Sequence, residues 1–239
     1  MISILYEEPH FLLVDKPAAL FSQAAGQVDS LQRRLTQQLK ERDGHPGEPF
    51  IGLPHRLDRG TSGIMLIARN QRALKRFGEQ FQSRKVVKQY LAIVEGEFPH
   101  SSQVWEDYLR KVTDQPLAEV VKEAVDGAKL ARATIKCLHH EAATSLLLVQ
   151  IETGRMHQIR IQAASRGFPV VGDAAYGAQL AFAPQAVTDD APHSHPPVAL
   201  HAWSLEFRHP RTAKSMTFTA PVPDSWDCLA TGRFARQLP

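Results

Sequence analysis

Short apolar segments of strand type follow one another through most of this 239-residue sequence, with only a few helical segments between them. The strand-type segments are 2–6, 11–17, 63–68, 89–96, 104–109, 131–138, 145–152, 198–207 and 215–221. The segment GIMLIA at 63–68 is almost wholly apolar, which is typical of a strand buried on both faces. Because strands succeed strands without regular βαβ alternation, the pattern predicts an α+β protein with a central, mostly antiparallel sheet and flanking helices.

Two of the helical segments have clear ends. Segment 29–44 has a leucine at every fourth position from Leu31 onward; Asp29 or Ser30 can cap its start and Gly44 its end. A second helix is expected to begin after Asn70. Its apolar stripe consists of Leu74, Phe77 and Phe81. Both segments therefore predict amphipathic helices that cover a sheet.

Composition indicates a folded protein of ordinary polarity. No apolar run approaches the roughly 18 residues of a membrane span, and acidic residues follow the N-terminus too soon for a signal peptide. The cysteines are Cys137 and Cys228, with no paired spacing that would suggest structural zinc. We interpret them as reduced thiols and expect a cytoplasmic protein. One domain over 1–239 is expected, with surface insertions near 99–127 and 181–198.

The net charge of +3 permits a polyanionic partner without requiring one. Charge density within 56–88 is higher than in the chain as a whole. Its cations are Arg56, Arg59, Arg69, Arg72, Lys75, Arg76, Arg84, Lys85 and Lys88, against Asp58 and Glu79. This region could hold a phosphate backbone, and a solvated helix face is the alternative.

The motif PHRLDRGTSG places one carboxylate, Asp58, between Arg56 and Arg59 directly before the apolar strand. Nearby positive charge favours the ionised form of a carboxylate. An ionised, positioned carboxylate can act as a nucleophile or a general base. An ion pair that stabilises a turn explains the same spacing, so the motif alone leaves both interpretations open.

Two further segments hold candidate site residues. Segment 155–167 is interpreted as a helix ending at Gly167, in which His157 and Arg160 share a face. Arg160 could then reach a carboxylate on another segment, or it could be a surface arginine. Asp173 is interpreted as structural. Tyr90 lies near the start of a strand, where its ring could pack in the core or stack on a planar ligand.

Together these segments resemble the RluA-type pseudouridine synthases. HRLD-x-x-TSG, KQYLAIVEG and HQIR followed by GD-x-x-YG stand in the family's order, as do ILYEEPHFLLVDKPAAL at the start and LHAWSLEFRHP near the end. The resemblance covers almost the whole chain. It implies the pseudouridine synthase fold and the isomerisation of specific uridines in structured tRNA or rRNA. It implies no cofactor and no metal, and we expect a monomer that needs no protein partner.

The resemblance also implies roles for individual residues. Asp58 matches the catalytic aspartate, and Arg160 the basic residue that pairs with it. Arg56 matches the arginine that displaces the target base, and Tyr90 the tyrosine that stacks on the flipped uracil. Ile161 matches an apolar residue of the base pocket. His55 and Leu57, which flank Arg56, are expected to contribute to substrate binding.

Several alternatives remain. A catalytically inactive RNA-binding protein on the same fold would have a replaced aspartate, whereas Asp58 is present. HRLD resembles a scrambled kinase catalytic loop, but no glycine-rich phosphate loop or DFG accompanies it. Gly60 to Gly63 does not match the G-x-S-x-G motif of serine hydrolases. A metal site at His193, His195 and His201 is not expected, because a proline-rich loop offers no regular ligand geometry.

Overall fold

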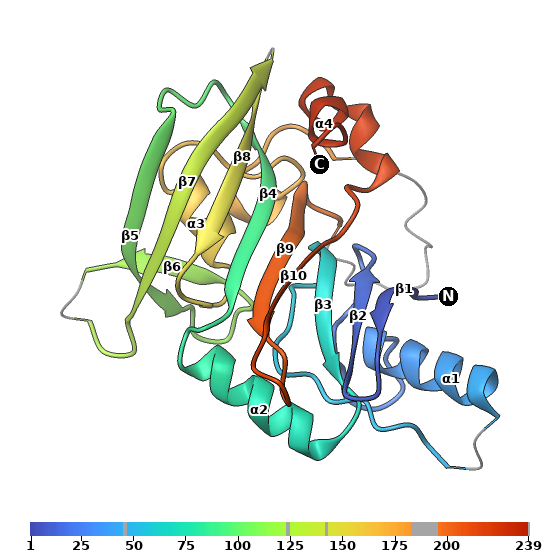
Figure 1. Ribbon diagram of the computed structural model, residues 1–239. Coiled ribbons are helices and arrows are strands. Elements are labelled where there is room, and N and C mark those ends of the chain that lie inside the picture. The colour runs from blue at the N-terminus through green and yellow to red at the C-terminus, as the bar shows by residue number, and fades with distance from the viewer. Residues whose placement is uncertain (45–46, 123–124, 142, 183–195, 239) are drawn as a thin grey trace. The chain divides into compact units, whose positions relative to one another are not determined.

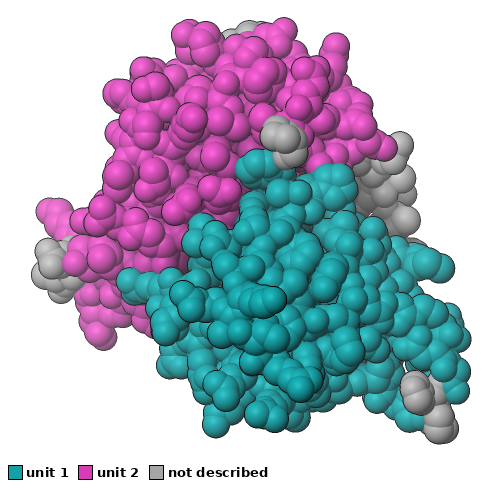
Figure 2. Space-filling model, in the orientation of Figure 1, with its two compact units in different colours: residues 1–87, 202–221 teal, residues 88–201, 222–239 magenta. Residues whose placement is uncertain are grey.

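The computed structural model describes residues 1–44, 47–122, 125–141, 143–182 and 196–238, and Figure 1 shows their elements. They form two compact units, coloured separately in Figure 2. Unit 1 comprises Met1–Val87 and Ala202–Pro221, and unit 2 comprises Lys88–His201 and Val222–Pro239. The chain passes from one unit to the other three times, so each unit is built from segments far apart in sequence.

The sheet of unit 1 runs in the order β1-β2-β3-β9, and β10 also pairs with β9. The β1–β2, β2–β3 and β9–β10 pairs are antiparallel. Its strands are β1 (Ser3–Glu7), β2 (Phe11–Lys16), β3 (Ser62–Ala68), β9 (Leu200–Arg208) and β10 (Ser215–Thr219). Every residue of β3 is buried, which confirms the expectation for the GIMLIA segment.

The helices of unit 1 begin and end where their capping residues predict. In α1 (Leu31–Asp43), the Ser30 side chain accepts a hydrogen bond from a backbone N–H of the first turn, and Gly44 ends the helix at φ 62°. In α2 (Gln71–Gln82), the Asn70 side chain caps in the same way. The core beneath α2 is aromatic. The rings of Phe11, Phe77 and Phe207 meet edge to face at centroid distances of 5.3–5.7 Å.

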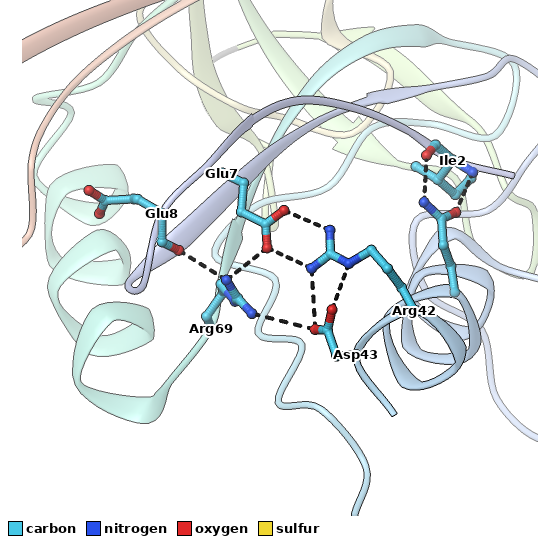
Figure 3. Close-up of polar contacts among 7 residues, drawn as sticks. Ile2, Glu7, Glu8, Arg42, Asp43 and Arg69 are labelled. Atoms are coloured by element: carbon cyan, nitrogen blue, oxygen red, sulfur yellow. Dashed lines mark hydrogen bonds and ion pairs between the residues drawn. The ribbon is translucent and has the colours of Figure 1, made fainter. Parts of the chain in front are cut away.

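Polar contacts join the C-terminal end of α1 to β1 and to the end of β3 (Figure 3). Arg42 donates two hydrogen bonds of 2.7 Å to the Glu7 carboxylate and also contacts Asp43. Arg69, just after β3, donates to Glu7 at 2.9 Å. The hydrogen bonds from Arg42 lower the pKa of Glu7. Because these side chains are partly exposed, we expect the network to fix orientation more than to add stability.

The sheet of unit 2 runs in the order β4-β8-β7-β5-β6, and each of these neighbouring pairs is antiparallel. Its strands are β4 (Val87–Glu95), β5 (Ser102–Lys111), β6 (Ala118–Val121), β7 (Lys129–Glu141) and β8 (Thr144–Ile151). β5 and β6 fall inside 99–127, so much of that expected insertion consists of paired strands. The expected insertion at 181–198 lies largely outside the described residues.

Short helices complete unit 2. They are α3 (Gln158–Ala164), α4 (Ala230–Ala235) and the 3-10 helices η1 (Ala174–Tyr176) and η2 (Asp224–Cys228). The expected α+β class with mostly antiparallel strand pairing is confirmed. No helix among the described residues is long and apolar enough to cross a membrane.

The helix expected over 155–167 is shorter, because it begins only at Gln158. His157 adopts a left-handed conformation with φ 50° and lies outside the helix, so the expectation that it shares a helical face with Arg160 is wrong. The Gln158 side chain fixes the preceding loop: its Oε1 accepts from Thr153 Oγ1 at 2.6 Å and its Nε2 donates to the Arg132 carbonyl. These contacts hold the bend at 152–153 and the turn at 156–157 that precede α3.

A buried lysine ends β2. The Lys16 side chain is 0% exposed, and its Nζ donates to the carbonyl oxygens of Pro17, Leu20 and Arg59 at 2.9, 2.8 and 3.3 Å. All three N–H donors of an ammonium group are therefore used by backbone oxygens. The lysine fastens the chain after β2 to the turn that precedes β3.

Burial also changes proton binding at this position. Desolvation lowers the pKa of Lys16 from 10.5 to about 7, against the attraction of Asp58 and Asp15. Between these two values the unfolded chain binds more protons than the folded one, so the free energy of unfolding rises with pH. Asp15 affects the free energy of unfolding in a more acidic pH range. Desolvation raises its pKa from 3.8 to about 6, so its contribution to stability falls as pH rises through that interval.

We predict that Lys16→Met removes the alkaline part of this dependence. The stability difference between wild type and Lys16→Met should grow in favour of wild type above pH 7, by up to about 1.4 kcal/mol per pH unit. Denaturant unfolding at a series of pH values measures this difference. Lys40→Met, at an exposed position of α1, is the control and should give a constant difference. Parallel profiles for wild type and Lys16→Met would contradict the assignment.

Candidate functional site

The turn that carries Asp58 is bound to unit 1 through its backbone. The Ser22 hydroxyl donates to the carbonyl of Leu57 at 2.7 Å and accepts from the N–H of the same residue at 3.0 Å. The N–H of Thr61 donates to the Asp58 carbonyl at 3.1 Å and closes the turn. Asp58 therefore lies on a backbone that is held on both sides.

Arg59 is part of the same support. Its Nε donates to the carbonyl of Ala19 at 3.1 Å, and its guanidinium lies 4.8 Å from the centre of the Phe21 ring. Its own carbonyl accepts from Lys16. Of the two arginines that flank Asp58 in the sequence, Arg59 thus has a structural role.

The glycine of the TSG motif is required by backbone packing. Gly63 has φ 113°, and a Cβ at this position would lie 2.2 Å from the carbonyl oxygen of Ala202 in β9. Only glycine permits both this conformation and this approach. Because β3 starts here, the contact fixes the distance between β9 and the turn that holds Asp58.

The other predicted residues of the turn differ in exposure. Arg56 is exposed and makes no hydrogen bond or ion pair with the residues described, whereas Asp58 is half-buried and interacts electrostatically with Lys16. Leu57 is 7% exposed. The His55 ring stacks on Phe81 at 4.6 Å, and its Nε2 accepts from the backbone N–H of Leu66 at 2.9 Å. These contacts assign His55 to support of the turn, and its role in substrate binding stays a prediction.

In unit 2, Arg160 forms a buried, bidentate ion pair. Its Nε and Nη2 donate to the two carboxylate oxygens of Asp173 at 2.6 and 2.7 Å. The guanidinium also lies 5.0 Å from the centre of the Tyr176 ring. The Tyr176 hydroxyl accepts from the N–H of Ala118 and lies 2.8 Å from Nδ1 of His157. The structural interpretation of Asp173 is thus supported, because this carboxylate orients Arg160.

A second glycine supports that ion pair. Gly172 has φ 86°, and a Cβ there would lie 2.5 Å from the Cβ of Phe182. The residue before Asp173 must therefore be glycine for the chain to turn at this point.

The remaining predicted residues also lie in unit 2. Tyr90 is half-buried on β4, where it pairs with Val149 of β8. Ile161 is half-buried on α3, directly after Arg160. Unit 2 thus holds Tyr90, Arg160 and Ile161, whereas unit 1 holds the four predicted residues from His55 to Asp58. The pairing of Asp58 with Arg160 stays a prediction.

Sequence reasoning missed two residues that support the turn, Lys16 and Ser22. Lys16 had a usable signal, because a lysine that ends an apolar strand such as FLLVDK must either reach solvent or find buried acceptors. No sequence signal pointed to Ser22, because its hydrogen bonds go to the backbone of Leu57, 35 residues further along the chain. His193 and His195 lie outside the described residues, so the expected absence of a metal site stays a prediction.

Comparison with known proteins shows one family. Residues 10–165 match the family model described as RNA pseudouridylate synthase. A ribosomal large subunit pseudouridine synthase D of Nitrosomonas europaea is 33% identical over 238 residues, covering 100% of this chain and 66% of the relative. The protein of the same name from Pseudomonas aeruginosa is 34% identical, covering 94% and 69%. The chain therefore spans about two thirds of the length of these relatives.

Solved structures show the same fold. The human RNA pseudouridylate synthase domain containing 4 protein superposes with a TM-score of 0.75 at 23% identity, covering 99% of this chain and 94% of that one. The human domain containing 1 protein gives 0.67 at 26% identity, covering 92% and 83%. With its family model, its curated relatives and its fold in agreement, this chain belongs to the RNA pseudouridylate synthase family.

Proposed function

We propose that this chain isomerises specific uridines to pseudouridine in structured RNA, with Asp58 as its catalytic carboxylate. The observation that carries the proposal is the position of Asp58: the family match includes it, and the turn that bears it is fixed by Lys16, Ser22 and Gly63. A side chain that must meet one atom of a flipped nucleotide needs such a rigid support.

The reaction breaks the bond between C1′ and N1 of uridine and forms one between C1′ and C5. The C5 hydrogen leaves as a proton, and N1 gains a proton. Asp58 serves either as a nucleophile at C1′ or as a base at C2′; both roles require the carboxylate. Neither role uses a cofactor or a metal, in keeping with the expectation from the family resemblance.

Arg56 and Tyr90 are proposed to stabilise the extruded base. Removing a base from the stack costs a few kcal/mol. Arg56 is exposed beside Asp58 in the turn and is suited to replace the base in the helix. Tyr90 offers an aromatic ring for the flipped uracil, and Ile161 an apolar wall. Leu57 and His55 complete the substrate-binding set as residues of the same turn.

Arg160 is proposed to pair with Asp58 while Asp173 holds it in position. A guanidinium has five N–H donors, and the ion pair with Asp173 takes two of them. Enough donors remain for a second carboxylate. In this scheme Asp173 is a positioning residue, because it acts on the reaction only through Arg160.

Large-subunit ribosomal RNA is the proposed substrate. The curated relatives that match 93–100% of this chain are named for the ribosomal large subunit. Family members that act on tRNA are the alternative, and mapping of the modified uridines distinguishes the two.

Asp58→Asn should abolish pseudouridine formation while leaving RNA binding intact. The substitution preserves shape but removes the charge and the basicity, whereas phosphate contacts supply most of the affinity. Tritium release from C5-labelled uridine in an unmodified rRNA transcript measures the reaction, beside a binding assay and a thermal melt. Asp114→Asn, in an exposed turn, is the control and should be fully active. A folded Asp58→Asn protein with near-normal tritium release would show that the assignment is wrong.

Arg56→Ala should impair turnover of structured RNA more than turnover of a short single-stranded oligonucleotide with the same uridine. The single strand has less stacking to break, so an arginine that replaces the base matters less there. Steady-state rates on both substrates test this, with Arg56→Lys as the variant that keeps the charge but loses the planar group. Equal losses on the two substrates would mean that Arg56 does not open the helix.

A further inference from the structure

Unit 1 carries eight exposed cations on two segments that lie far apart in sequence. Residues 71–85 comprise α2 and the turn after it; residues 206–215 comprise the end of β9 and the turn into β10. The cations are Arg72, Lys75, Arg76, Arg84, Lys85, Arg208, Arg211 and Lys214. The same segments hold two carboxylates, Glu79 and Glu206. None of the eight cations forms an ion pair with a carboxylate in the part of the chain that the structure describes.

Hydrogen bonds bring the two segments together. The side-chain amide of Gln80 donates to the carbonyl of Arg208 at 2.8 Å and accepts from the N–H of the same residue at 2.8 Å. Beneath this contact, Phe77 of α2 meets Phe207 of β9 edge to face at 5.6 Å. In Figure 1 the turn between β9 and β10 accordingly lies beside α2. The basic region predicted over 56–88 is thus extended by a hairpin more than a hundred residues away.

The charges of α2 are not arranged to stabilise the helix. Arg72 lies in the first turn, which holds no acidic residue, although the positive end of the helix dipole disfavours a cation there. Arg72 and Arg76 are four residues apart, a spacing at which like charges repel. The first turn of α1 also lacks an acidic residue, but α1 differs in that Arg34 pairs with Asp29 and Arg42 with Glu7. An ordinary solvated helix face therefore describes α1 better than α2.

A hollow of about 370 Å³ lies between the two segments. Its lining consists of Lys85, Glu206, Phe207, Arg208 and Ser215. The Ser215 hydroxyl donates to the Glu206 carboxylate at 2.9 Å, which holds that carboxylate in the wall of the hollow. Two cations and a hydroxyl suit a phosphate group, whereas Glu206 opposes it. Removing the charge of Glu206 should therefore raise the affinity of this surface for phosphate groups.

We propose that these eight cations, here named the α2–hairpin surface, bind the phosphate backbone of the structured RNA that carries the target uridine. The proposal rests on the proposed function for the identity of the partner. The surface makes no contact with base edges in this role, so it adds affinity and orientation without reading sequence. It should act on a folded RNA that is long enough to cover α2 and the β9–β10 turn.

The test measures the affinity of the full chain for an unmodified large-subunit rRNA transcript across a salt series. The variants are Lys85→Gln/Arg208→Gln and Arg211→Gln/Lys214→Gln. Gln80 contacts only the backbone of Arg208, so the first pair leaves the joint between the segments intact. The control is Arg33→Gln/Lys40→Gln on α1, which removes the same charge from exposed positions of the same unit.

Each α2–hairpin pair should weaken binding by about tenfold at low salt and reduce the salt slope by about 1 for each phosphate that the variant no longer neutralises. The control pair should change neither. Glu206→Gln keeps the acceptor for Ser215 but removes the charge, and should tighten binding several-fold. Structural damage would not tighten binding. The two α2–hairpin pairs, the α1 control pair and Glu206→Gln together therefore distinguish a docking surface from a folding defect.

Three outcomes would overturn the proposal. The control pair could lose as much RNA affinity as the α2–hairpin pairs, or neither α2–hairpin pair could change RNA affinity. In the third outcome, the α2–hairpin pairs lose affinity for anionic phospholipid vesicles but not for RNA. The last would assign the surface to a membrane. Tritium release from a short uridine oligonucleotide, measured with the unsubstituted chain, tests the proposed function separately. Turnover of that oligonucleotide together with unaltered RNA affinity in the variants would leave the function standing and the docking surface wrong.

Discussion

One buried ammonium group holds together the part of unit 1 on which the proposed chemistry depends. Lys16 has no exposed surface, and its three donors reach the chain after β2 and the turn after Asp58. Burying a lysine is costly, as the fall of its pKa to about 7 shows. The cost is offset only while the three carbonyls stay in place, so the position of the turn and the burial of the lysine depend on each other.

The two units hold different parts of the proposed reaction. Unit 1 presents a carboxylate and an exposed arginine on one rigid turn. Unit 2 presents an arginine that Asp173 orients, with Ile161 on the same helix and Tyr90 on β4. A glycine supports the local structure in each unit. At Gly63 and at Gly172, a Cβ would lie 2.2 and 2.5 Å from neighbouring atoms. The glycines of TSG and GD are therefore explained by close packing rather than by chain flexibility.

Local patterns predicted most of the fold, since caps and apolar runs act over a few residues. Ser30, Gly44 and Asn70 place the ends of α1 and α2 correctly. The predicted start of α3 was wrong, because the Gln158 side chain donates to the distant carbonyl of Arg132. No local sequence pattern shows this contact. The same limit applies to the site. The motifs name Asp58 and Arg160 as candidates, but the contacts of Ser22 with the Leu57 backbone and of Asp173 with Arg160 become evident only when the chain is folded.

The central claim is that this chain modifies defined uridines through Asp58. The most direct measurement maps pseudouridines in the ribosomal and transfer RNA of cells that lack the protein and of cells that express it. We expect one or a few large-subunit rRNA positions to lose the modification, and expression of the wild-type chain, but not of Asp58→Asn, to restore it. Identical maps with and without the protein, or full restoration by Asp58→Asn, would contradict the account.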